Sequence, residues 1–103
     1  MNSRNKGAAG ERELANILKD YGFDTRRGQQ FCGANGDADV VGLPGIHIEV
    51  KRVEKLNIDI AMNQARVDAR PDEIPAVFHR RNYKGWLVTM DLDDFMHLYK
   101  KGE

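Results

Sequence analysis

The sequence predicts a single α/β domain with a mixed β-sheet, and three observations lead to this prediction. A length of 103 residues suits one domain with a modest core. Segments with helical spacing of apolar residues alternate along the chain with short apolar runs typical of strands. Apolar residues make up 41% of the chain and charged residues 31%, a balance that is ordinary for folded proteins and argues against disorder.

The first half of the chain begins with a predicted amphipathic helix. Within residues 10–21, apolar side chains follow the i, i+3, i+4, i+7 spacing of a one-sided helix. Gly22 ends this helix, because glycine readily adopts the conformation that terminates helices. Residues 23–31 form a weaker strand candidate, and residues 32–36 form a loop.

Two further strands, at residues 36–41 and 46–51, flank a turn at residues 43–45. Side chains alternate between the two faces of a strand. The apolar residues of the second strand therefore share one face, and its charged face carries His47, Glu49 and Lys51.

The second half of the chain adds a helix, two strands and a last helix. Small apolar residues on one face predict a helix over residues 58–69 that packs closely on a sheet. Strands follow at residues 76–79 and 86–90, around a turn at residues 82–85. Residues 91–94 begin the last helix, whose acids lie where the helix dipole favours them. Its buried stripe is expected to be Leu92, Phe95, Met96 and Tyr99, and Trp86 and Phe95 are expected in the core.

The turn at residues 43–45 fixes how its two strands pair. Ala38 and Val40 must share a sheet face with Ile48 and Val50, so only even registers are allowed. A three-residue loop then places Asp39 opposite Glu49, with Cβ atoms about 5 Å apart. In the same register, Asp37 lies opposite Lys51. Facing carboxylates repel each other unless one is protonated or a divalent cation lies between them.

This element order, with Asp39 followed by the triplet Glu49-Val50-Lys51, resembles the PD-(D/E)XK nuclease superfamily and its restriction-endonuclease-like fold. The segment 6–14, Lys-Gly-Ala-Ala-Gly-Glu-Arg-Glu-Leu, followed by Tyr-Gly-Phe at 21–23, is similar to archaeal-type Holliday junction resolvases and their phage relatives. The resemblance implies a metal-dependent DNA endonuclease that acts in recombination and repair. An acid early in the first helix completes the active site of that family, and the matching position is Glu11.

The resemblance implies specific roles for these residues. Asp39 and Glu49 bind Mg²⁺ or Mn²⁺ together with the Val50 backbone carbonyl, because hard oxygen ligands suit these ions. Lys51 orients the attacking water or helps to deprotonate it, and it stabilises charge on the phosphate. Glu11 acts from its helix, through a metal-bound water. Two further residues stay open: Gln64 is either a site residue or an exposed glutamine, and Asp37 is either a ligand or a turn residue.

Net charge is zero, yet basic residues gather in short groups that a fold can bring to one surface. The candidate phosphate contacts are Arg4, Lys6, Arg26, Arg27, Arg52, Lys55, Arg80 and Arg81. Paired cuts in a branched DNA junction imply a homodimer. His47 is expected to be a sheet-surface histidine and Cys32 a packing residue.

The sequence also bears on domain organisation and location. One nuclease domain is expected over residues 1–103, with residues 1–7 as a flexible tail. No segment suits a membrane span or a secretory signal, so a cytoplasmic protein without membrane association is expected. Two alternatives remain: a small phage or mobile-element nuclease for other DNA structures, and a non-cleaving DNA-binding module on the same fold.

Overall fold

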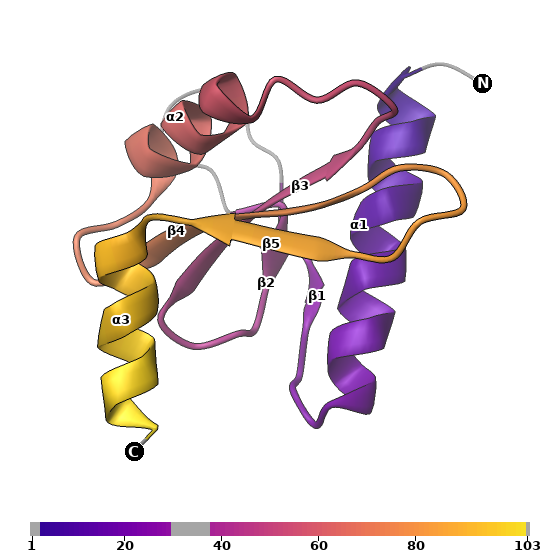
Figure 1. Ribbon diagram of the computed structural model, residues 1–103. Coiled ribbons are helices and arrows are strands. Elements are labelled where there is room, and N and C mark those ends of the chain that lie inside the picture. Colours follow the sequence, from indigo (N-terminus) through magenta and orange to yellow (C-terminus); the bar gives the residue numbers. More distant parts are fainter. Residues whose placement is uncertain (1–2, 30–37, 103) are drawn as a thin grey trace.

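The computed structural model describes residues 3–29 and 38–102, with side chains from residue 7 onward. Its elements form a mixed α/β domain in the order helix, three strands, helix, two strands, helix, which confirms the predicted order and the restriction-endonuclease-like fold (Figure 1). The elements are α1 (Ser3–Asp20), β1 (Arg26–Arg27), β2 (Val40–Val41), β3 (Ile46–Arg52), α2 (Ile58–Asp68), β4 (Ile74–Arg80), β5 (Leu87–Met90) and α3 (Leu92–Lys101).

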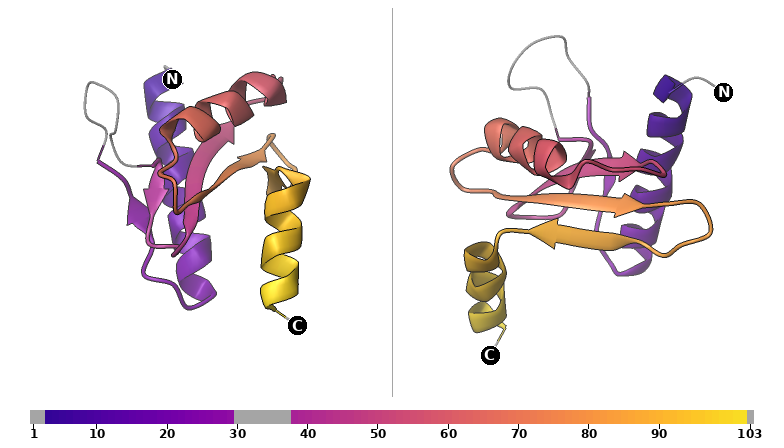
Figure 2. Two further views of the ribbon diagram at one scale, coloured as in Figure 1. Left: turned by 90° about the vertical axis from the view of Figure 1, so that its left-hand side faces the viewer. Right: turned by 45° about the horizontal axis from the view of Figure 1, so that its top comes forward.

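The five strands form one sheet in the order β1-β2-β3-β4-β5. Among the strands of the described residues, only β3 and β4 are parallel, and α2 makes the crossover that a parallel pair requires. The other neighbouring strands are antiparallel. Helices α1 and α2 lie on opposite faces of the sheet, as the two views of Figure 2 show.

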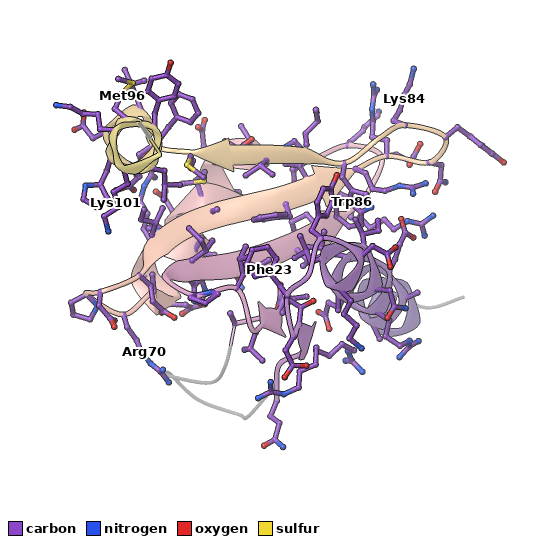
Figure 3. The ribbon with its side chains drawn as sticks, turned by 90° about the horizontal axis from the view of Figure 1, so that it is seen from below. Phe23, Arg70, Lys84, Trp86, Met96 and Lys101 are labelled. Atoms are coloured by element: carbon purple, nitrogen blue, oxygen red, sulfur yellow. The ribbon has the colours of Figure 1, made fainter. Side chains whose placement is uncertain are left out.

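The core has two parts, one on each face of the sheet. Between α1 and the sheet lies a cluster of buried residues, formed by Leu14 and Ala15 of α1 and by Val40, Ile48, Val50, Ala76 and Phe78 of the strands. Trp86 is only partly buried, packs against this cluster and lies next to α1 in Figure 3. Between α2 and the other face lies a second cluster, formed by Ala61, Met62 and Ala65 of α2 and by Val77 of β4. The small residues of α2 therefore pack on the sheet as expected, and the charged face of β3 lies on the α2 side.

Two glycines permit close approaches that shape the site. Gly42 has a φ of +107°, and a Cβ atom there would lie 2.1 Å from the Asp24 carbonyl oxygen, so only glycine fits at the end of β2. A Cβ atom on Gly10 would lie 3.1 Å from the Cβ of Arg52. Helix α1 therefore passes directly over the end of β3 at Arg52. Glu11, the residue after Gly10, lies beside this end of the strand.

The predicted buried stripe on α3 is wrong, because all four of its residues are exposed, by 72% at Leu92, 49% at Phe95, 41% at Met96 and 56% at Tyr99. Strand β5 is the edge strand of the sheet, and α3 leaves it beyond that edge, where none of the other described elements covers the helix (Figures 1 and 2). Met96 points outward from α3 in Figure 3.

Element boundaries differ from the predictions in two places. Helix α1 begins at Ser3, within the segment 1–7 that was expected to be a tail. The weak strand candidate at 23–31 contains a strand of only two residues, Arg26–Arg27. Asp37 and Cys32 lie outside the described residues. Within the described part of the chain, no helix is both long and apolar enough to span a membrane.

Candidate active site

The pairing of β2 with β3 has the predicted register, because Val40 lies opposite Ile48. Asp39 is the residue before β2, and its backbone N–H donates to the Ile48 carbonyl at 3.0 Å. Its carboxylate Oδ2 accepts a hydrogen bond from the Val50 backbone N–H at 2.8 Å. The Asp39 carboxylate is therefore held against the backbone of β3 at the Glu49-Val50-Lys51 triplet.

A cavity of about 290 Å³ opens at this point, where α1, β3 and α2 approach one another. Its lining includes residues from α1, from the paired segments before β2 and in β3, and from α2. The structure thus brings together Glu11, Asp39, Glu49, Val50, Lys51 and Gln64, all of them candidates from the sequence.

Glu49 is a buried acid in this cavity, with only 4% of the residue exposed. Burial, and then the charge of Asp39, raise the pKa of its carboxyl from 4.5 to about 8. Lys51 acts in the opposite direction, with its Nζ 3.8 Å from Glu49 Oε2. The two strands therefore place a pair of carboxylates closer together than both can easily ionise.

Glu11 joins this pair from α1. Its Oε1 accepts a hydrogen bond from Arg27 Nε at 3.0 Å. Burial raises the pKa of Glu11, the Arg27 hydrogen bond lowers it, and the Asp39 charge raises it again. Because Asp39 acts on both Glu11 and Glu49, the three acids form one electrostatic cluster.

Glu13, the other acid early in α1, has a different environment. Its Oε1 accepts hydrogen bonds from Arg80 Nη1 at 2.5 Å and from the Trp86 indole N–H at 2.9 Å. Arg52 Nε lies 3.7 Å from its Oε2. Glu13 therefore ties α1 to the ends of β3 and β4, whereas Glu11 lines the acidic cavity.

The family model for the archaeal Holliday junction resolvase (Hjc) matches residues 2–68. The chain belongs to this family. The predicted resemblance is thereby confirmed, and the matched segment runs from α1 to the end of α2, which includes every described residue of the acidic cavity. A search of curated proteins found no match. Family membership supports a Holliday junction resolvase-type nuclease that binds branched DNA.

The family implies a metal cofactor, and the donor set of the cavity fits a hard divalent cation. Asp39, Glu49 and Glu11 offer carboxylate oxygens, and the Val50 carbonyl belongs to the same stretch of strand. Mg²⁺ and Mn²⁺ prefer such oxygen ligands. A bound cation would also remove the repulsion between Asp39 and Glu49, which raises the pKa of Glu49.

The predicted phosphate contacts fall into two groups in this resolvase-family fold. Arg26, Lys55 and Arg81 are exposed. Three others have internal acidic partners: Arg27 pairs with Glu11, whereas Arg52 and Arg80 pair with Glu13. The side chains of Arg4 and Lys6, in the first turns of α1, are not among those described.

His47 was expected on the sheet surface, but only 3% of it is exposed, because α2 covers that face of β3. The missed signal is the spacing of polar residues on α2. Gln64 and Asp68 are four residues apart and therefore share one helix face. Gln64 lines the acidic cavity, and Asp68 lies near His47.

Proposed function

We propose that this protein is a divalent-metal-dependent endodeoxyribonuclease that cleaves phosphodiester bonds in four-way DNA junctions. The observation that carries this proposal is the meeting of Glu11, Asp39, Glu49 and Lys51 in one cavity, from α1, from β3 and from the chain just before β2. A structural ion-pair ladder would need only Glu49 and Lys51. It would not need a third and a fourth polar residue from α1 and from the chain before β2.

Asp39, Glu49 and the Val50 carbonyl would hold Mg²⁺ or Mn²⁺, and Glu11 would act from α1. When bound, the cation supplies Lewis-acid activation of water and charge neutralisation at the phosphate. The Val50 N–H bond to Asp39 Oδ2 fixes the direction of that carboxylate. Arg27 restrains Glu11 in the same way from β1. The acids are therefore preorganised by the backbone and by a neighbouring side chain.

Lys51 would contribute a positive charge of the protein to the active site, in addition to that of the cation. Its side chain is 31% exposed and its Nζ lies on the Oε2 side of Glu49, so the ammonium group faces the cavity. There it would donate hydrogen bonds to the attacking water and to a phosphate oxygen. Such a preorganised donor stabilises the charge that develops in the transition state.

The exposed basic residues Arg26, Lys55 and Arg81 would position DNA through its phosphates, without reading bases. Arg27 pairs with Glu11, which lines the cavity, and would contact the phosphate nearest to the cleaved bond. Binding would weaken steeply with salt, because each phosphate contact releases counterions.

A homodimer is part of the proposal, because resolving a junction requires paired cuts. The outward face of α3 is the surface proposed for the second copy, since Leu92, Phe95, Met96 and Tyr99 are uncovered. The helix carries Asp93 and Asp94 in its first turn and Lys100 and Lys101 in its last turn. Two copies of α3 packed antiparallel across a two-fold axis would therefore place acids against lysines at both ends.

The direct test uses a labelled four-way junction with the metal-free protein, to which Mg²⁺ is then added. Cleavage is expected only with the metal. Lys51→Met should lower the rate at least about 100-fold, because one preorganised donor is removed. Lys19→Met, at an exposed position in the last turn of α1, is the matched control and should cleave like the wild type.

A substrate panel separates the alternatives. Preference for the junction over flap, nicked and linear DNA supports the resolvase assignment, and equal rates on all of them favour a nuclease for other DNA structures. Junction binding without cleavage under any divalent metal would favour a non-cleaving module on the same fold.

A further inference from the structure

We propose that His47, Glu49 and Asp68 form a second cation site, for a transition-metal ion such as Zn²⁺ or Mn²⁺, on the inner side of Glu49. One ligand atom from each of the three residues lies within 4.8 Å of the other two. The site is formed by β3 and the end of α2. It does not depend on the proposed cleavage reaction, because it rests on a different set of side chains around Glu49.

The unpartnered ring nitrogen of His47 is the observation that points to a ligand. His47 is 97% buried, and among the described residues its Nε2 has no hydrogen-bond partner. This nitrogen lies 4.0 Å from Glu49 Oε1, too far for a hydrogen bond. A buried polar atom without a hydrogen-bond partner destabilises the fold, so a ligand bound to this nitrogen would remove that penalty.

The two oxygens of Glu49 face different neighbours. Oε1 lies on the His47 side and Oε2 on the Lys51 side. A cation held by His47 and Asp68 would therefore bind Oε1 and leave Oε2 for the acidic cavity. It would also hold the Glu49 carboxylate in its ionised form and in a fixed direction.

A second cavity, of about 260 Å³, gives access to this site from the end of the sheet opposite Lys51. His47, Asp68 and Glu73 line it. Glu73 Oε1 is 3.8 Å from His47 Nδ1 and accepts a hydrogen bond from the Arg70 backbone N–H. Glu73 therefore lies on the Nδ1 side of the imidazole, where carboxylates commonly orient metal-binding histidines, and it would have to move closer to accept a hydrogen bond from that nitrogen.

The donor set indicates which ions fit. Imidazole nitrogen with two carboxylate oxygens suits Zn²⁺, Mn²⁺ or Co²⁺ better than Mg²⁺, which prefers oxygen alone. Ligand distances of about 2.1 Å would require the three ligand atoms to close by about 1 Å. Asp68 is exposed at the end of α2, so its side chain is free to make this movement.

The test follows the ring nitrogens of the three histidines by ¹H–¹⁵N NMR, in full-length metal-free protein titrated with Zn²⁺ and separately with Mg²⁺. Zn²⁺ should shift the Nε2 signal of His47, and Mg²⁺ should not. His79, bonded to Thr89, and exposed His97 are internal controls. A His47 signal that does not respond to Zn²⁺, or a response confined to His97, would overturn the proposal.

Asp68→Asn provides a second measurement that does not disturb the core. It should weaken Zn²⁺ affinity at least about tenfold, as measured by calorimetry, because it removes a charged ligand. Asp20→Asn, at an exposed acid on α1, should leave Zn²⁺ affinity unchanged. If Zn²⁺ binds as expected but no junction is cut, the nuclease proposal fails and the second cation site stands. If the junction is cut but Zn²⁺ does not bind, only the second cation site is refuted.

Discussion

Replacing Glu49 by Gln should make the metal-free fold more stable at neutral pH while abolishing cleavage. The cause is the raised pKa of Glu49, about 8 in the folded protein against 4.5 in its ordinary environment. Between these two values the folded state binds more protons than the unfolded state, so its stability falls as pH rises. One proton corresponds to at most about 1.4 kcal/mol per pH unit.

The expected magnitude follows from that slope. Between pH 5 and pH 7 the wild type should lose up to about 3 kcal/mol of unfolding free energy through Glu49, and the loss should level off above pH 8. Glu49→Gln has no carboxyl to ionise and lacks this part of the slope. In a domain of this size each kcal/mol changes Tm by about 4–8 °C, so the difference is easily measured.

The assay is urea unfolding of both proteins in EDTA at pH 5, 6, 7 and 8. The quantity of interest is the stability difference between variant and wild type, because groups outside the acidic cluster titrate equally in both. Asp72→Asn, at an exposed acid before β4, is the control and should show no such trend. A stability difference that stays constant from pH 5 to pH 8 would refute the account of Glu49.

Three further predictions concern other parts of the molecule. Glu13→Gln should lower the unfolding free energy by about 1–2 kcal/mol in denaturant titrations, because Arg80 and Trp86 lose a charged acceptor. Glu11→Gln should instead reduce cleavage with little change in stability. The opposite pattern would contradict the assignment of Glu11 to the active site and of Glu13 to the fold. Arg26→Ala should reduce the slope of log affinity against log salt by about 1 for junction DNA, and an unchanged slope would remove Arg26 from the binding surface. Phe95→Glu should convert a dimer to a folded monomer in sedimentation experiments, whereas Lys84→Glu in the β4–β5 turn should not.

The sequence predicts the pairing of the strands around Asp39 and Glu49 better than it predicts the last helix. Alternation along residues 46–51 and a three-residue turn are local features, and together they determine the register that places Asp39 near Glu49. Glu11 is distant in sequence, and only the resemblance to a family linked it to this pair. The structure supplies the physical link, which is the close approach of Gly10 to Arg52.

The wrong prediction for α3 has an equally local origin. An apolar stripe indicates that one face of a helix is buried against a partner, but it does not identify that partner. Here β5 ends the sheet, so α3 runs past the edge and its stripe stays uncovered in the single chain. His47 shows the reverse error, because a polar residue on a charged strand face becomes buried when α2 crosses over it. Both errors concern tertiary neighbours, which periodicity along one element does not contain.

Glu49 combines a local sequence signal with effects of its tertiary neighbours. The position of Glu49 in its strand follows from the sequence, but its raised pKa comes from the residues that surround it in the fold. Burial excludes water from the carboxyl, and Asp39 adds a like charge. His47 lies on the Oε1 side of the same carboxyl. A carboxylate in this position opposes folding unless a cation or a proton neutralises it. Metal binding should therefore stabilise the fold as well as enable chemistry, and the gain should disappear in Glu49→Gln. A Tm increase with Mn²⁺ that was equal in both proteins would show that the cation binds elsewhere.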